Sequence, residues 1–167
     1  MRTKSQQGFT MVELITVMII VGILAAVAMP KFFSRSDYDG REFYDQVKAT
    51  LRYAQKAAVA QRRFVCVAFP ANNSMTLTFG ANSSCTSGAL ASPTGTPYPL
   101  TSTQSTFLPF PITSFSFDCL GRPRSAGSTA ATCDAGNLVG VLLTSPSVIV
   151  SGYASPITVE AETGYVH

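Results

Sequence analysis

An apolar run near the amino terminus constrains this chain more than any other feature. Residues 9–29 contain one charged side chain, Glu13. As a helix rising about 1.5 Å per residue, the run spans roughly 31 Å, which matches a bilayer's hydrocarbon core and exceeds an ordinary signal core. The sequence therefore predicts one membrane-crossing helix. Because an intramembrane carboxylate costs about 2.5–3.5 kcal/mol, we expect Glu13 either to snorkel to the headgroups or to meet a partner.

Length and charge limit the remainder of the chain. With 167 residues, of which 46% are hydrophobic and 13% charged, there is room for the apolar segment and one further domain, residues 30–167. The formal charge of +3 falls to +1 if Arg2 and Lys4 are removed, leaving ten basic and nine acidic residues. This balance gives no electrostatic case for a nucleic-acid partner.

The cysteines point to an oxidising compartment. There are four, no two of them form a C-x-x-C pair, and the chain has one histidine, so disulfides are favoured over zinc ligation or free thiols. Of the three connectivities, Cys66–Cys85 with Cys119–Cys133 is favoured because each bond closes a short loop. No metal or cofactor is predicted.

An ordinary secretory signal is the alternative for the amino terminus. Basic Arg2 and Lys4, an apolar stretch and the small-x-small site at residues 26–28 fit cleavage near residue 28. The length of the apolar run argues against this, and a signal peptide has no use for Glu13.

The segment GFTMVEL (residues 8–14), followed by an apolar helix and Pro30, resembles the class III signal of type IV pilins and type II secretion pseudopilins. The resemblance implies that a prepilin peptidase cuts between Gly8 and Phe9 and methylates the new amine of Phe9. Residues 1–8 are then a cytoplasmic leader, consistent with the positive-inside rule. In the assembled filament, Glu13 pairs with the terminal amine of a neighbouring subunit.

The same resemblance implies a location and partners. The chain is expected to be a single-pass inner-membrane protein with a periplasmic carboxyl-terminal domain. It then enters a pilus or pseudopilus at the surface of a Gram-negative bacterium. Its partners are the prepilin peptidase, other major and minor pilins and the inner-membrane assembly platform.

A second helix is predicted over residues 41–63. Pro30 should kink the chain before it, and residues 37–40 should weaken the helix locally. Its predicted buried face consists of residues at three- and four-residue spacing: Phe43, Val47, Leu51, Ala54 and Ala58. The opposite face is charged: Arg41, Glu42, Asp45, Lys48, Arg52 and Lys56.

Short strands follow this helix. We predict a hairpin over residues 64–69 and 75–79, a loop over 80–105, and strands over 112–118, 138–143, 148–151 and 157–160. One long helix followed by antiparallel strands indicates an α+β fold with the helix laid across a sheet.

Residues 44–69 are similar to the helix-to-first-strand signature of the pseudopilin branch that groups GspH with FimT. SRSDYDGREFYDQ and CLGRP bring the chain nearest to minor pilins of the mannose-sensitive haemagglutinin (MSHA) pilus. This implies a structural subunit that contributes to filament assembly, adhesion or surface attachment. A type II secretion minor pseudopilin and a DNA-uptake pilin are the alternatives.

Two groups of residues are candidates for chemical sites. Arg122 and Arg124 form a GRxR pattern that DNA-uptake pilins place at the carboxyl end, where this chain has GYVH, so a turn with two solvated arginines is favoured over a DNA contact. His167 with Glu160 and Glu162 is the only group that resembles acid/base machinery. Without a nucleophile motif or a phosphate-binding loop, no enzyme is predicted, and the tail is expected to fray on an edge strand.

Overall fold

The computed structural model describes residues 9–32, 35–93, 95, 98, 100–109, 112–127, 140, 142 and 144–167. The chain divides into two compact units, Met1–Arg35 and Ser36–His167.

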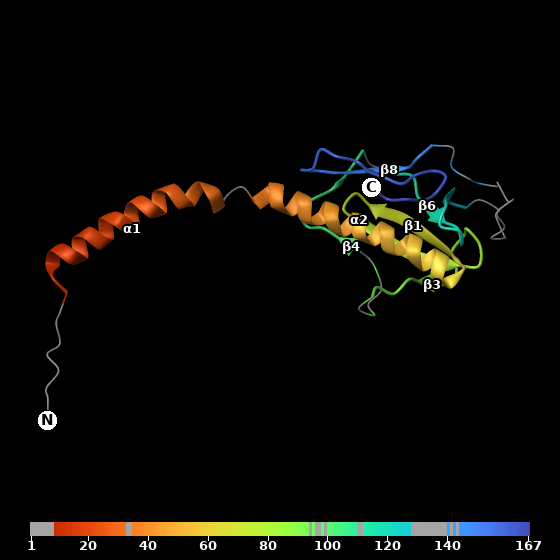
Figure 1. The fold of residues 1–167 in the computed structure, drawn as a ribbon, viewed down its shortest axis with the longest axis horizontal. Helices are drawn as coiled ribbons and strands as arrows, with labels where there is room; N and C mark the ends of the chain where they lie inside the picture. Colours follow the sequence, from red (N-terminus) through yellow and green to blue (C-terminus); the bar gives the residue numbers. More distant parts are fainter. Residues whose placement is uncertain are drawn as a thin grey trace, which may run out of the picture. The chain divides into compact units, whose positions relative to one another are not determined.

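The described residues of the first unit include the helix α1 (Met11–Phe32) (Figure 1). Its apolar side chains are exposed around the helix, from Met11 at 77% to Val27 at 66%. Because apolar side chains surround α1, no single face of the helix can be assigned as the one that packs against a partner. The backbone stays helical through Pro30 to Phe32, and the kink expected at Pro30 stays a prediction.

By length and apolarity taken together, none of the helices in the described residues qualifies as a membrane-spanning segment.

Helix α2 (Arg35–Gln61) begins earlier than predicted and runs through Gly40 without a break. The prediction that residues 37–40 weaken it is wrong, because Gly40 is a packing contact. A Cβ at Gly40 would lie 2.9 Å from the carbonyl oxygen of Ser151 and 3.2 Å from backbone atoms of Gly152. Only a residue without a side chain allows the helix to approach that turn so closely.

The main sheet has six strands in the order β3-β2-β1-β6-β7, with β4 also paired to β2. Every pairing among them is antiparallel. The strands are β1 (Phe64–Ala71), β2 (Ser74–Gly80), β3 (Gly88–Ala89), β4 (Leu100–Thr101), β6 (Phe115–Phe117) and β7 (Pro123–Ser125).

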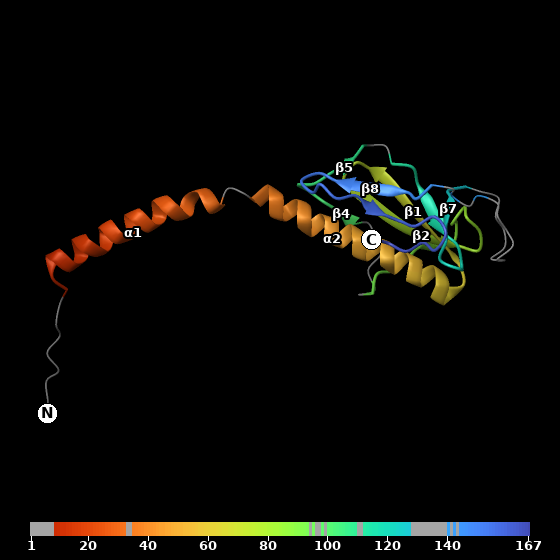
Figure 2. The ribbon, with the colours of Figure 1, turned by 45° about the horizontal axis from the view of Figure 1, so that its top comes forward.

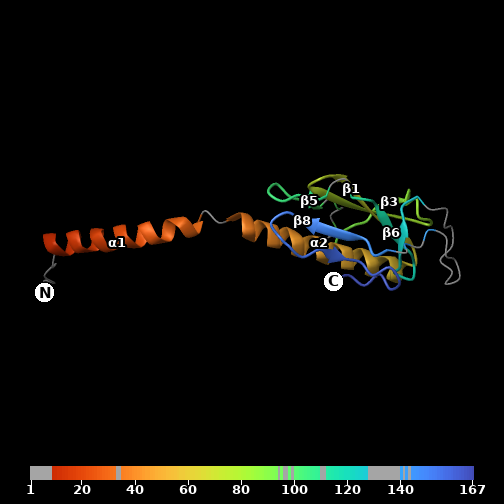
Figure 3. The same cartoon turned by 90° about the horizontal axis from the view of Figure 1, so that it is seen from above.

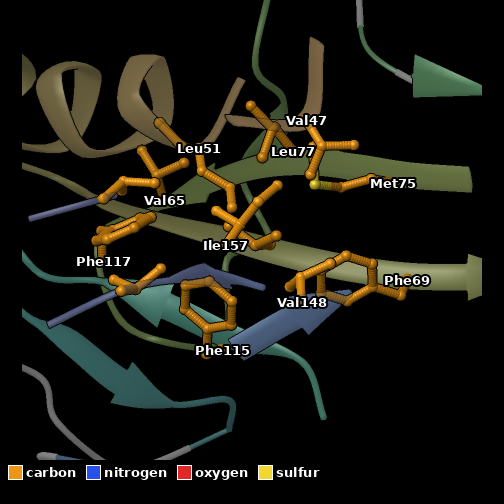
Figure 4. Packing of buried hydrophobic residues seen from close by; sticks show 14 of the residues in the cluster. Val47, Leu51, Val65, Phe69, Met75, Leu77, Phe115, Phe117, Val148 and Ile157 are labelled. Atoms are coloured by element: carbon orange, nitrogen blue, oxygen red, sulfur yellow. The ribbon is translucent and has the colours of Figure 1, made fainter. Parts of the chain in front are cut away.

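Strand register places one apolar row against α2. Val67 lies opposite Leu77 on β2 and opposite Phe115 on β6, so these three side chains share a face of the sheet. Val47 and Leu51 of α2 approach this face, and all five are buried (Figure 4). The predicted helix stripe is confirmed, since its five members are each at most 3% exposed.

A smaller sheet completes the core. Strands β5 (Phe107–Leu108), β8 (Ser147–Val150) and β9 (Ile157–Thr158) pair antiparallel in the order β5-β8-β9 (Figure 2). The rings of Phe43 and Phe107 lie 5.3 Å apart, and those of Tyr44 and Tyr153 lie 4.1 Å apart. Helix α2 therefore contacts both sheets, and Figure 3 shows it running along one side of β1, β3 and β6.

The predicted α+β class, a helix followed by an antiparallel sheet, is confirmed, as is the β1–β2 hairpin. The predicted loop 80–105 also contains β3 and β4, which sequence patterns miss because two-residue strands show no alternation. β5 and β7 were missed too, and the predicted strand 138–143 falls largely outside the described residues. Within it, Gly140 and Leu142 form backbone hydrogen bonds with Ser125 and Pro123, respectively.

Candidate assembly site and the Asp118 hairpin

The amino terminus of α1 is fixed by a side-chain cap. Thr10 precedes the first helical residue, and its Oγ1 accepts a hydrogen bond from the backbone N–H of Glu13 at 3.3 Å. Its carbonyl oxygen accepts the first helical hydrogen bond, from the N–H of Leu14 at 3.2 Å. Thr10-x-x-Glu13 is the sequence signature of a capping box, which would have identified Thr10 as a site residue, but the prediction considered only Glu13.

This cap places a carboxylate one turn from Phe9. Both side chains are exposed, Phe9 at 84%. Glu13 lies in the first turn of α1, where a negative charge also interacts favourably with the helix dipole. The arrangement can place the Glu13 carboxylate close to the backbone nitrogen of Phe9 or to a group bound there. Gly8 and the other residues of the predicted leader, 1–8, lie outside the described residues.

A second arrangement of charged groups is built on the β6–β7 hairpin. Asp118 follows β6, and its Oδ1 accepts hydrogen bonds from the backbone N–H groups of Leu120 and Arg122, each at 2.9 Å. Its Oδ2 lies 3.1 Å from Nε of Arg122 and 2.9 Å from Nε of Arg124. Asp118 and Arg124 have no exposed side-chain surface, and Arg122 retains 19%.

The expectation that both arginines are solvated is wrong for Arg124. Arg124 is neither solvated nor able to reach a DNA phosphate, because its charged group is buried against Asp118. Arg122 is turned toward the same carboxylate. The arginines of the hairpin instead bind the carboxylate of Asp118, which directly follows β6. The local sequence pattern gave no indication that Asp118 is buried.

Two disulfide-bonded regions lie near this hairpin. Cys66 of β1 is joined to Cys85, and a disulfide also involves Cys119. Cys133, the partner predicted for Cys119, lies outside the described residues. Phe64, Cys85 and Cys119 form a second buried cluster with Cys66 packed against it.

The carboxyl terminus is paired, so the prediction of a frayed tail is wrong. His167 and Thr158 exchange two backbone hydrogen bonds, and Val159 forms a bridge with Val166. His167 Nε2 lies 3.1 Å from Glu160 Oε1, with both side chains about half exposed. This pair lies on the open surface and contacts none of the other charged groups described above.

Among the described residues, His, Cys, Asp and Glu side chains nowhere gather in threes at a spacing suited to a metal ion.

Comparison with protein families finds a match at the amino terminus. Residues 3–29 match the family described as the prokaryotic N-terminal methylation motif. The type IV narrow pilus major component PilA5 of Thermus thermophilus is 38% identical over 63 residues, which is 38% of this chain and 52% of the relative. A fimbrial protein of Pseudomonas aeruginosa is 37% identical over 71 residues, 40% of this chain and 44% of the relative.

A secretion-system protein is similar to the same degree. The type II secretion system core protein G of Pseudomonas aeruginosa is 37% identical over 60 residues, 36% of this chain and 37% of the relative. The chain thus spans about half or less of the length of the curated relatives it matches. No solved structure matches. The chain has a prokaryotic N-terminal methylation motif, and its relatives are type IV pilins and a type II secretion protein.

Proposed function

We propose that this chain is a structural subunit of a type IV pilus or of a type II secretion pseudopilus, and not an enzyme. One observation supports this above the others. The methylation motif covers residues 3–29, and most of these residues belong to a helix whose apolar side chains are exposed on all sides. Such a helix needs an apolar environment, first lipid and then the matching helices of other subunits.

Processing is the first step of the proposed mechanism. A prepilin peptidase cuts between Gly8 and Phe9 and methylates the amine of Phe9. The leader with Arg2 and Lys4 remains on the cytoplasmic side. Before assembly, residues 9–29 hold the chain in the inner membrane, and the domain from residue 30 onward is periplasmic. Disulfide bonding of Cys66 to Cys85 suits that oxidising compartment.

Assembly is the second step. Glu13 is exposed in the first turn of α1 and has one helical turn between it and Phe9. The carboxylate pairs with the Phe9 amine of a neighbouring subunit as α1 leaves the lipid. Two groups that are each costly in hydrocarbon lower that cost by meeting, and the pair sets the axial register of adjacent subunits.

The kind of filament is a finer proposal. Similarity of residues 44–69 to the GspH/FimT branch supports a minor subunit of an MSHA-like pilus, acting in assembly, adhesion or surface attachment. Similarity to a type II secretion core protein supports a pseudopilin as the second candidate. DNA uptake is the weakest, because Arg124 is buried on Asp118. Two experiments distinguish the first two candidates. Shearing of cells should release a pilus subunit together with surface filaments. Deletion of a pseudopilin should instead stop secretion through the type II system.

Intact mass and amino-terminal sequencing of the chain from its own cell envelope test the proposal. We expect a methylated Phe9 as the first residue, and an uncleaved precursor for Gly8→Ala. Gly22→Ala is the matched control, because a Cβ at Gly22 meets no atom within 4 Å. A mature chain that begins at Met29 would instead establish an ordinary secretory signal and refute the filament proposal.

A further inference from the structure

The acidic side chains of α2 all lie in its first half, where Arg35 and Arg41 accompany them, and the second half carries basic side chains alone. Every acidic residue of the helix lies at or before Asp45, and every charged residue after it is basic. The helix dipole favours this order only within the first and last turns, so it does not account for mid-helix charges such as Asp45 and Arg52. The division therefore calls for another explanation.

The basic half carries an unfavourable arrangement within one chain. Lys48, Arg52 and Lys56 follow one another at four-residue spacing, at which like charges repel. In the part of the chain that the structure describes, none of the three forms a salt bridge with a carboxylate. Arg52 donates from Nε and Nη2 to the carbonyl of Val166, at 3.1 and 3.0 Å, which leaves its other N–H groups for a further acceptor.

Both halves of the helix face are hollowed. The basic hollow, of about 340 Å³, is lined by Arg52, Gln55, Lys56, Tyr165 and Val166. The acidic hollow is a shallow, largely open depression lined by Tyr38, Arg41, Glu42, Asp45, Gln46 and Ala49. Arg41 lies on the flank of the acidic hollow, one residue and about 100° around the helix from Glu42. The small side chain of Ala49 leaves room beside the two carboxylates for a long basic side chain.

We propose that a second copy of this chain occupies these hollows, with two α2 helices running parallel and staggered so that the acidic hollow of one faces the basic hollow of the next. Glu42 and Arg52 are ten residues apart, and Asp45 and Lys56 are eleven. At about 1.5 Å per residue, shifting one helix along the other by about 15–16 Å places Glu42 of one copy beside Arg52 of the next, and Asp45 beside Lys56.

The parallel direction rests on the proposed function, because equivalent subunits of one filament are related by a rotation and a rise along its axis and therefore share an orientation. An antiparallel pair would instead place Glu42 opposite Lys56. The parallel contact is head to tail, so it joins copies that lie next to each other in the assembly and does not close into a symmetric dimer.

Zero-length crosslinking with a carbodiimide tests this contact in the full chain, in its own envelope. The reagent condenses a lysine amine with a carboxylate, with loss of water. Within one helix Asp45 and Lys56 lie about 16 Å apart, so an amide between them joins two chains. We expect a covalent dimer on a denaturing gel and an Asp45–Lys56 linked peptide in its digest.

Charge reversal then identifies the pair. Lys56→Glu alone and Asp45→Lys alone should each reduce the dimer about tenfold, and the two changes in one chain should restore it, because the attraction is re-formed with its signs exchanged. Arg62→Glu and Glu162→Lys are matched controls on exposed residues outside both hollows and should leave the dimer unchanged.

Three results overturn the inference: a Glu42–Lys56 link without an Asp45–Lys56 link, links from Lys56 to other proteins only, or failure of the double reversal to restore the dimer. Sequencing the same preparation keeps this separate from the proposed function. A chain that begins at methylated Phe9 and lacks the Asp45–Lys56 link retains the function and loses the contact.

Discussion

Arg124 Nε lies 2.9 Å from Oδ2 of Asp118, and neither side chain has any exposed surface. Removing two such charges from water costs several kcal/mol per ion, so the pair is stable only where each charged group also forms further hydrogen bonds. Asp118 meets that condition with four donors, two from the backbone of its own turn and two from arginines. The pair therefore fixes the β6–β7 hairpin and does not form a surface for a ligand.

Asp118→Asn should lower the free energy of unfolding by about 3–5 kcal/mol, because it keeps the side chain's shape and leaves the Arg124 charge buried without its anion. Urea unfolding of the purified full chain, followed by tyrosine fluorescence, measures the change. All six tyrosines lie within Ser36–His167, so the signal reports that unit alone.

Glu162→Gln is the control for Asp118→Asn, since it removes an exposed carboxylate and should change stability by less than about 0.5 kcal/mol. Combining Asp118→Asn with Arg124→Met should cost less than the sum of the two single changes. A loss below about 1 kcal/mol for Asp118→Asn would mean that the buried pair contributes little.

Gly40→Ala should destabilise the domain even though alanine is the better helix former. The new Cβ would lie 2.9 Å from the carbonyl oxygen of Ser151, and that backbone must move to admit it. We expect a net loss of about 1–3 kcal/mol in the same unfolding measurement. Gly22→Ala, whose Cβ meets nothing within 4 Å, should leave the unfolding of Ser36–His167 unchanged. Equal stability of parent and Gly40→Ala would show that α2 can shift away from the turn.

The parts of the fold that could be predicted are those in which one periodic pattern extends over many residues. Val47 and Leu51 recur at helical spacing over a long segment, and the alternation of β1 survives because both neighbouring strands pair with it. Strands of two residues, such as β5, have no period to detect. β5 forms because β8 supplies its hydrogen-bonding edge and Phe43 of α2 packs against Phe107.

Burial of charge was harder to predict for a related reason. A GRxR segment rich in turn residues predicts solvent-exposed arginines. Arg124 is buried because its segment pairs with β6 as a strand, which the local sequence does not indicate. Register places Arg124 opposite Ser116, and Asp118, the residue directly after β6, accepts a hydrogen bond from Nε of Arg124. Helix capping at Thr10, by contrast, has a four-residue signature and could have been predicted from sequence.

Removing the Cys66–Cys85 disulfide should lower stability through the unfolded state. The bond closes a loop with a sequence separation of 19, for which loop-closure entropy gives about 3 kcal/mol. The double change Cys66→Ser with Cys85→Ser avoids leaving a lone thiol, and reductant added to this variant shows the additional effect of the disulfide that involves Cys119. Alkylation of the unreduced, denatured chain should modify neither cysteine. Labelling at Cys66 without reductant would contradict the pairing.

Glu13→Val should leave membrane insertion intact, because it removes a charge from the apolar segment. It should nevertheless reduce incorporation into filaments by at least about tenfold. The amine of the neighbouring subunit's Phe9 would then enter an apolar environment unpaired, at a cost of about 2.5–3.5 kcal/mol, which exceeds the roughly 1.4 kcal/mol that a tenfold change requires. Quantitative immunoblotting of the membrane and of the sheared or detergent-released filament fraction measures both quantities.

Two further variants separate the charge of Glu13 from its place in the helix cap. Thr10→Ala removes the Oγ1 that accepts the N–H of Glu13, at a cost of about 1 kcal/mol to the helix start, and keeps the carboxylate. Glu13→Asp keeps both the charge and a side chain suited to the first helical turn. If charge pairing drives assembly, Thr10→Ala and Glu13→Asp should incorporate to within about threefold of the parent, and Glu13→Gln should fail as Glu13→Val does. Normal incorporation of Glu13→Gln would instead mean that the carboxylate acts only before assembly, by holding the helix end at the lipid headgroups.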